Sequence, residues 1–145
     1  MVMIRTNTVL NTDDIEFIVI HCSDTPNNEN LNALDIHKMH LGFGWEGIGY
    51  HKVICRSGEI QNGRPEYWIG AHTYGINKIS LGVCLIGKDN FNSYQFNSLK
   101  KIIIDWKKRF PSAIIKGHKD VINTSKTCPN FNVQKWLLSV NIINA

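Results

Sequence analysis

The hydrophobic residues of the chain occur in short continuous runs and in longer periodic segments. Four short runs are rich in Val and Ile and are bounded by Gly, Ser, Asn or Pro, which is typical of β-strands. They cover residues 17–20, 51–55, 81–86 and 113–115. The sequence RSGE at residues 56–59 indicates a tight turn, so we expect residues 59–62 to pair back on the second run as a hairpin.

Helical periodicity lies between and after these runs. Residues 34–41 predict a short helix, and residues 133–140 predict a last one. Apolar residues at spacings of three and four predict a long helix between them: Phe96, Leu99, Ile102, Ile103, Trp106 and Phe110. We expect Asn92 and Gln95 to cap the start of this helix and Pro111 to end it.

Strands that alternate with helices predict an α/β fold with a central mixed β-sheet flanked by helices. The length of 145 residues suits one domain with a core of its own. We therefore interpret residues 1–145 as a single domain in which residues 1–15 form an N-terminal extension. The order of the strands along the chain does not determine which of them run parallel.

The composition is that of a globular protein, with 43% hydrophobic and 19% charged residues. No apolar run has the length of a membrane-spanning helix. The first 17 residues hold one early Arg, no continuous apolar core and nearby acidic residues, so they make a poor secretory signal. We expect no membrane span and synthesis in the cytoplasm.

The chain carries a net charge of +4, and nine of its sixteen basic residues lie between Lys100 and Lys135. Such a surplus favours an anionic partner, either nucleic acid or a cell-wall polymer. No RNA-binding aromatic signature, zinc finger or recognition-helix pattern accompanies the charge. We therefore interpret the basic residues as a solvated helix face and expect no nucleic-acid partner.

The four cysteines fall into two classes and form no CxxC motif. Cys22, Cys55 and Cys84 lie in or beside apolar runs, where buried, reduced thiols are expected. Cys128 differs because it lies in the polar segment SKTCPN.

Two of the six histidines follow the same local pattern. His21 ends the run FIVI, and His118 follows AIIKG, so both stand where a predicted strand ends. Side chains at the ends of neighbouring strands can meet over a cleft, and ten residues separate His118 from Cys128. Two imidazoles and a thiolate suit zinc, with a fourth position left for water. Spacing alone leaves a second interpretation open, because a His at a strand end is more often a satisfied polar residue than a ligand.

Four segments carry a resemblance to a known family: IVIHCSDTP, GWEGIGYHKVICRSGEIQNGRP, IGAHTYGINKISLGVCLIG and IIKGHKDVINTSKTCPNF. They resemble, in the same order, the motifs of the type 2 N-acetylmuramoyl-L-alanine amidases. The similarity is greatest to the small endolysins of T-odd coliphages, and peptidoglycan recognition proteins are distant relatives. The resemblance implies a zinc-dependent enzyme that cuts the amide between the lactyl group and the L-Ala of peptidoglycan, as an endolysin does in host lysis.

The resemblance also implies roles for individual residues. One Zn²⁺ would be held by His21, His118 and Cys128, in a cleft at the strand ends. The active-site residues would be Tyr50, in the triplet GYH, and Lys126. Between His118 and Lys126 the sequence departs from the more usual acidic-then-proline pattern of the family, which leaves the shape of this loop open.

Without the resemblance, Tyr50 would be interpreted as a packing residue and Lys126 as a surface residue. In amide hydrolysis either group would stabilise the oxyanion or deliver a proton to the leaving nitrogen. The sequence does not show which of the two residues performs which task. His72, in GAHTYG, is similar to a groove-lining position of the family. Contact between His72 and the substrate is therefore one of two open interpretations, and a residue without such contact is the other.

Other aromatic and imidazole side chains have plainer interpretations. His37 and His40, three apart on the short predicted helix, are expected to pack or to face solvent. The four tryptophans, Trp45, Trp68, Trp106 and Trp136, are mostly core candidates, although Trp45 and Trp68 lie in predicted loops from which they could contact sugar rings.

Three alternatives remain beside the enzyme. A protein of the same fold would bind muropeptides without cutting them, although such proteins typically lack the cysteine ligand. Some phage members also bind and restrain the phage RNA polymerase, which is compatible with amidase activity. A cysteine-nucleophile hydrolase would use Cys128 or Cys22 but would leave Lys126 without a role. We expect a monomer that acts on peptidoglycan at the cell wall after the membrane is permeabilised.

Overall fold

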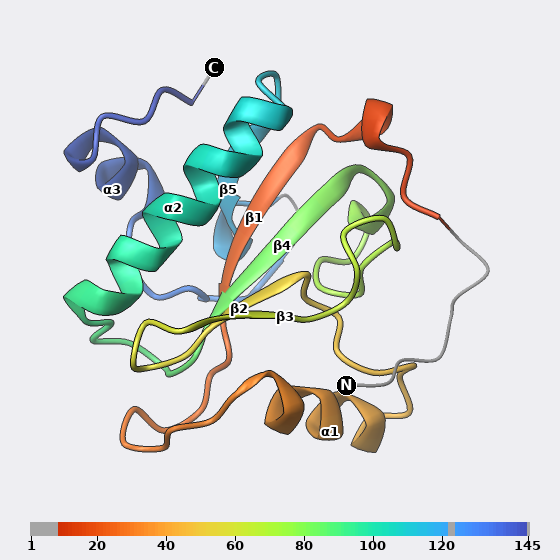
Figure 1. Cartoon of the computed structure of the whole chain (residues 1–145), viewed down its shortest axis with the longest axis vertical. Coiled ribbons are helices and arrows are strands. Elements are labelled where there is room, and N and C mark those ends of the chain that lie inside the picture. The colour runs from red at the N-terminus through yellow and green to blue at the C-terminus, as the bar shows by residue number, and fades with distance from the viewer. Residues whose placement is uncertain (1–8, 122–123, 145) are drawn as a thin grey trace.

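A computed structural model of the protein describes residues 9–121 and 124–144. Five strands form one sheet in the order β3-β2-β4-β1-β5 (Figure 1). Their bounds along the chain are β1 Phe17–Cys22, β2 Lys52–Ile54, β3 Ile60–Asn62, β4 Ser80–Leu85 and β5 Ile114–Gly117. Strands β2, β4, β1 and β5 run parallel, and β3 runs antiparallel to β2. The mixed sheet and the hairpin predicted from the sequence are thus confirmed.

The three predicted α-helices are present as α1 (Ala33–Gly42), α2 (Ser93–Arg109) and α3 (Val133–Ser139). The predicted cap of α2 is also present: the Asn92 side chain accepts from the backbone N–H of Gln95, at 2.9 Å, and the Gln95 side chain accepts from that of Asn92, at 3.3 Å. No helix among the described residues combines the length and apolarity that a bilayer crossing requires.

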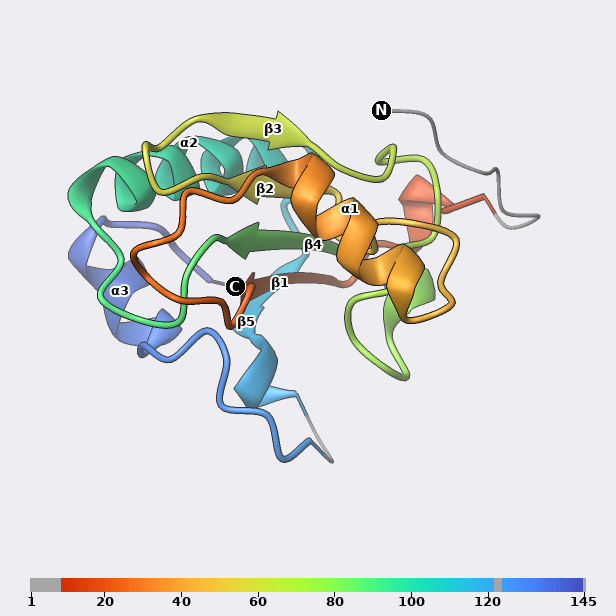
Figure 2. The same ribbon diagram turned by 90° about the horizontal axis from the view of Figure 1, so that it is seen from below.

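The two faces of the sheet are covered by different helices. Ile18 and Ile20 of β1 point into a core shared with α2 and α3, which includes the fully buried Trp106. The opposite face packs on α1, where Ile36 and Val53 belong to a second, smaller core. In Figure 2 the sheet separates α1 from α2. Parallel strands that are covered on both faces have continuous apolar runs in their sequence, because the side chains on both faces are buried.

The segment before β1 contributes to this core. Leu10 and Ile15 are buried in the larger cluster, and Val9 forms an isolated bridge with Trp68. Residues 1–8 of the predicted N-terminal extension lie outside the described residues. The division between an extension and the domain proper stays a prediction.

The cysteines follow the expectation drawn from their surroundings. Cys22, Cys55 and Cys84 are buried, free thiols, whereas Cys128 is half-buried. Cys55 and Cys84 therefore act as small apolar side chains, whereas Cys22 and Cys128 both line the groove at the carboxyl edge of the sheet.

Candidate functional site

The parallel pairing of β1 with β5 brings two histidines together. Ile20 of β1 pairs with Gly117 of β5. The residue that follows each of them, His21 and His118, therefore lies beside the other at the carboxyl edge of the sheet. Their ring centroids lie 4.7 Å apart. The prediction that neighbouring strand ends bring these side chains together is confirmed, with the difference that β1 continues through His21 to Cys22.

The loop after His118 returns to this edge and carries Cys128 with it. The backbone N–H of Lys119 donates to the carbonyl of Cys128 at 2.8 Å. The returning chain passes so close to β5 that a Cβ on Gly117 would lie 3.0 Å from both Pro129 and Val133. Glycine at position 117 therefore permits the approach that places Cys128 beside His118.

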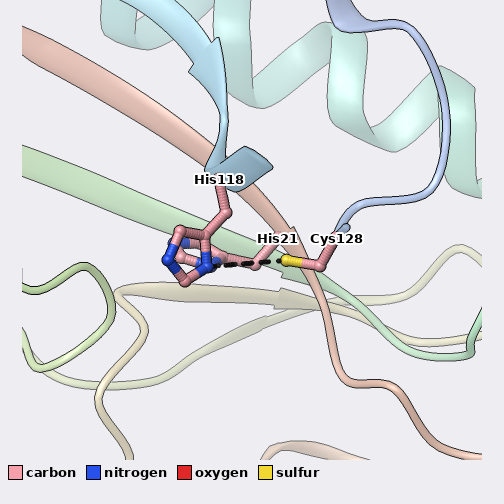
Figure 3. A group of neighbouring side chains, drawn as sticks. All are labelled: His21, His118 and Cys128. Carbon is pink, nitrogen blue, oxygen red and sulfur yellow. Dashed lines mark hydrogen bonds between the residues drawn. The ribbon is translucent and has the colours of Figure 1, made fainter. Parts of the chain in front are cut away.

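The three side chains present their donor atoms to one point (Figure 3). The Cys128 Sγ lies 3.8 Å from His21 Nδ1 and 3.7 Å from His118 Nδ1, and all three donor atoms lie within 4.8 Å of one another. With bonds of ordinary length, a tetrahedral zinc site places sulfur and nitrogen ligands about 3.6 Å apart. One thiol proton can satisfy only one of the two imidazoles. The donor set thus fits a metal ion better than it fits a hydrogen-bonded cluster.

The protonation states at the site agree with metal binding. Burial lowers the pKa of His21 well below its usual value, and burial followed by the charge of Lys126 lowers the pKa of His118. Both imidazoles are therefore neutral at pH 7, which is the form that binds metals. The hydrogen bond with the Cys22 thiol and then burial raise the pKa of Cys128. The thiol would lose its proton on coordination.

Tyr50 is held at the site by the loop that leads into β2. Two histidines of α1 accept hydrogen bonds from this loop: His37 Nδ1 from Ile48 N at 3.0 Å, and His40 Nδ1 from Gly49 N at 2.9 Å. Both are buried, so the interpretation as packing residues holds and the solvent-facing one does not. These two contacts fix the backbone immediately before Tyr50.

The Tyr50 ring lies against the proposed ligand His21, with 5.1 Å between ring centroids. Burial, followed by the nearby Cys84 thiol, raises the pKa of Tyr50 well above its usual value. The phenol therefore keeps its proton over the physiological range and offers a hydrogen-bond donor.

An open groove of about 650 Å³ connects these residues. Its lining includes Tyr50, Lys126 and three aromatic side chains that stay largely exposed: Phe43 at 63%, Trp45 at 44% and Tyr74 at 98%. Trp68, by contrast, is buried, so the interpretation as a core residue is confirmed for it and the alternative of contact with sugar rings does not hold. A position in a predicted loop does not distinguish the exposed Trp45 from the buried Trp68, because the burial of Trp68 comes from packing against distant segments.

His72 lies behind the proposed ligand His21, with both of its ring nitrogens in hydrogen bonds. His72 Nδ1 is 2.9 Å from His21 Nε2, and His72 Nε2 is 3.3 Å from Ser80 Oγ. The side chain of Asn77 accepts from the backbone N–H groups of His72 and Thr73, both at 2.9 Å. The sequence offers no local signal for the parts that Ser80, Thr73 and Asn77 take here, because a hydroxyl or amide beside a strand is common.

Comparisons with known proteins agree with this geometry. A match to the N-acetylmuramoyl-L-alanine amidase family spans residues 11–131. The endolysin of enterobacteria phage T3 is 33% identical over 129 residues, which cover 83% of this chain and 84% of the relative. Among solved structures, the N-acetylmuramoyl-L-alanine amidase LysC from Clostridium intestinale has a TM-score of 0.82 at 29% identity and covers 98% of this chain and 96% of its own.

The resemblance to peptidoglycan recognition proteins also holds at the level of structure. PGRP-SA of the bumblebee has a TM-score of 0.79 at 26% identity, and the match covers 92% of this chain and 86% of the other. The family match covers the whole sheet and the loop that carries Cys128. The chain therefore belongs to the N-acetylmuramoyl-L-alanine amidase family.

Proposed function

We propose that the protein is a zinc-dependent endolysin that hydrolyses the amide between the lactyl group of N-acetylmuramic acid and the L-Ala of the stem peptide. The observation that carries the proposal is the convergence of the His21, His118 and Cys128 donor atoms in the lining of an open groove. The similarity to the phage T3 endolysin over most of both chains supports peptidoglycan as the substrate and the cell wall as the place of action.

His21, His118 and Cys128 would hold the ion and leave its fourth position open to the groove. Zinc bound there would supply a Lewis acid for the scissile carbonyl and would lower the pKa of a coordinated water. A thiolate and two neutral imidazoles leave a net charge of +1 on the site, which preserves this acidifying effect.

Tyr50 would donate a hydrogen bond to the oxyanion that develops on the scissile carbonyl. Its raised pKa keeps the phenol protonated, and a protonated phenol is a donor rather than a base. The Tyr50 ring lies against the ring of the proposed ligand His21, and Tyr50 lines the same groove. Such a preorganised donor acts on the transition state more strongly than on the substrate.

Lys126 would bring a positive charge to the same groove. It is exposed and lies two residues before Cys128, and its side chain is part of the groove lining. An ammonium group at this place would offset the negative charge of the tetrahedral intermediate and would also have a proton to deliver to the leaving nitrogen.

The exposed aromatic residues of the groove suit a substrate with sugar rings. Phe43 and Trp45 pack edge to face, with ring centroids 5.5 Å apart, and leave an apolar surface open to the groove. Aromatic rings offer large apolar surfaces to the apolar faces of sugars, and the indole N–H of Trp45 adds a hydrogen-bond donor. We propose that this wall receives the glycan side of the substrate.

The alternative functions differ in what they require of Cys128. A cysteine nucleophile at Cys128 or Cys22 would need only one of the two histidines as its base and would leave the convergence of all three donor atoms without a purpose. A muropeptide-binding protein without catalysis would keep the groove but would not need the three converging donors. Binding to phage RNA polymerase and a monomeric state stay predictions from the sequence.

Mass spectrometry of purified sacculi tests the proposal directly. Sacculi are incubated with the natural protein, with the protein after chelation, and with chelated protein to which zinc is restored. We expect free stem peptides that begin with alanine in the first and third samples and none in the second. Intact sacculi in the presence of zinc-loaded protein would instead support the binding function.

A further inference from the structure

A buried chain of hydrogen bonds leads from the backbone to the proposed ligand His21. It runs from the carbonyl of Ile76 through Ser80 and His72 to His21 Nε2. Ser80 is fully buried, and His21 and His72 are 1% and 9% exposed. None of these contacts is needed to hold the sheet together, since the strand pairing of β1 and β4 already does so.

The direction of each bond follows from its fixed end. A backbone carbonyl only accepts, so Ser80 Oγ donates its single proton to the Ile76 carbonyl at 2.7 Å. At its 3.3 Å contact with His72 Nε2 the Ser80 oxygen must then accept. The proton of a neutral His72 ring therefore lies on Nε2, and its Nδ1 carries a lone pair.

The same reasoning extends to His21. His72 Nδ1 faces His21 Nε2 at 2.9 Å, and two lone pairs at that distance would repel each other. His21 Nε2 must therefore carry the proton. Thr73 Oγ1, 2.9 Å from His72 Nδ1 and 3.2 Å from His21 Nε2, is compatible with this, because a hydroxyl can donate to the first and accept from the second. His21 Nδ1 is left unprotonated, and it is the atom that faces Cys128.

The His72 ring has no room to turn away from this arrangement. A Cβ on Gly82 of β4 would lie 2.6 Å from His72 Cγ, and one on Gly70 would lie 2.7 Å from His72 Cδ2. The ring thus lies directly on two glycine backbones. The Asn77 side chain accepts from the backbone N–H of His72 and so fixes the backbone that carries the ring.

We propose that Ser80 and His72 form a positioning relay that holds the proton of His21 on Nε2 and presents the Nδ1 lone pair to the metal. The relay deepens the proposed zinc site and rests on it. A ligand His whose other nitrogen donates to a fixed acceptor has one tautomer and one ring orientation, and loss of such a partner typically weakens metal affinity by about 10- to 100-fold.

A matched pair of variants separates the hydrogen bond from the volume of the ring. His72→Asn keeps an acceptor oxygen at the position of Nδ1, whereas His72→Leu has nearly the same shape and no acceptor. We expect His72→Leu to bind zinc about 10- to 100-fold more weakly than the natural protein. We expect His72→Asn to restore most of that loss, and Ser80→Ala to fall between the two.

The readouts are the zinc dissociation constant, from competition with a chromophoric chelator, and the histidine tautomers, from long-range proton–nitrogen NMR of the metal-free protein. The natural protein should show His21 protonated at Nε2. The control Asn92→Ala removes a side-chain acceptor at the start of α2, outside the groove, and should leave zinc affinity unchanged.

Two results would overturn the relay. One is a metal-free natural protein in which His21 carries its proton on Nδ1. The other is equal zinc affinity in His72→Asn and His72→Leu, whether weakened or not, because volume and not the acceptor would then decide. Neither readout requires hydrolysis. If the relay is confirmed but sacculi stay intact, only the amidase proposal is contradicted. If sacculi are cut but the relay tests fail, only the relay is contradicted.

Discussion

The three proposed metal ligands are held with very different degrees of support from the backbone. His21 lies within β1, and His118 follows directly after β5. Cys128 lies in a loop that is fixed to the ligand edge by the hydrogen bond to Lys119 N. The residue type at 128 therefore decides whether the loop contributes a ligand, whereas its backbone contact is available to any residue.

For this reason, Cys128→Ala should keep its fold but lose both tight zinc binding and hydrolysis. Two imidazoles alone leave a site with too few ligands and no thiolate. Bound zinc, measured after gel filtration, and stem-peptide release are the two readouts. Full zinc-dependent activity in this variant would contradict the assignment of Cys128 as a ligand.

Tyr50 and Lys126 belong to the groove rather than to the ligand set, so their variants should behave differently. We expect Tyr50→Phe and Lys126→Ala to bind zinc as the natural protein does and to lose roughly 10²-fold or more in kcat, as for the loss of one oxyanion donor. Parallel measurement of zinc content and kcat checks this. Loss of zinc in either variant would show that the residue supports the metal site instead.

At the level of elements, the local signals in the sequence were sufficient where neighbours along the chain make the contacts. The periodicity of α2 and its cap at Asn92 are both local, and both were predicted correctly. The bounds of β2 were less accurate: the strand covers Lys52–Ile54, one residue shorter at each end than the predicted run of residues 51–55.

The cap of α2 gives a test of stability that is separate from function. Asn92 accepts from Gln95 N and also donates to the carbonyl of Arg56 at 2.7 Å. Asn92→Ala should lower the free energy of unfolding by about 1–2 kcal/mol, measured by urea denaturation. Zinc affinity should not change, since the hydrogen bonds of Asn92 go to Gln95 and Arg56, which are outside the proposed ligand set. A change in zinc affinity would indicate that the start of α2 is linked to the metal site.

For the whole molecule, the most consequential feature is the number of buried neutral histidines. Burial lowers the pKa of His40 to about 4, with further contributions from Arg64 and His37. Burial lowers the pKa of His51 to about 4 as well, although the Trp68 carbonyl opposes the shift. Below pH 6.5 the unfolded chain takes up protons at these positions and the folded protein does not.

The metal-free protein should therefore lose stability as the pH falls from about 6.5 towards about 4, and keep it above 6.5. Each of the two histidines accounts for roughly 2 kcal/mol between pH 7 and pH 5. Urea denaturation at both pH values measures the loss. His40→Asn keeps an acceptor for Gly49 N without titrating, so its loss should be smaller by about that amount. An equal loss in this variant would contradict the role of His40.

Sequence and tertiary structure contribute different parts of this account. Strand runs, helix periodicity, caps and the residue types at positions 21, 118 and 128 are properties of short segments, so they can be read from the chain. The resemblance to amidases then links these segments to a function, and the family match over residues 11–131 confirms that resemblance.

The rest depends on contacts between distant segments, which local patterns do not encode. The parallel register that sets His21 beside His118, the return of Cys128 over Gly117, and the burial of Trp68 arise only when the sheet assembles. The Ser80–His72–His21 contacts join two strands and a loop. Side chains fix one another's proton positions only at hydrogen-bonding distance, and the folded chain alone brings them that close.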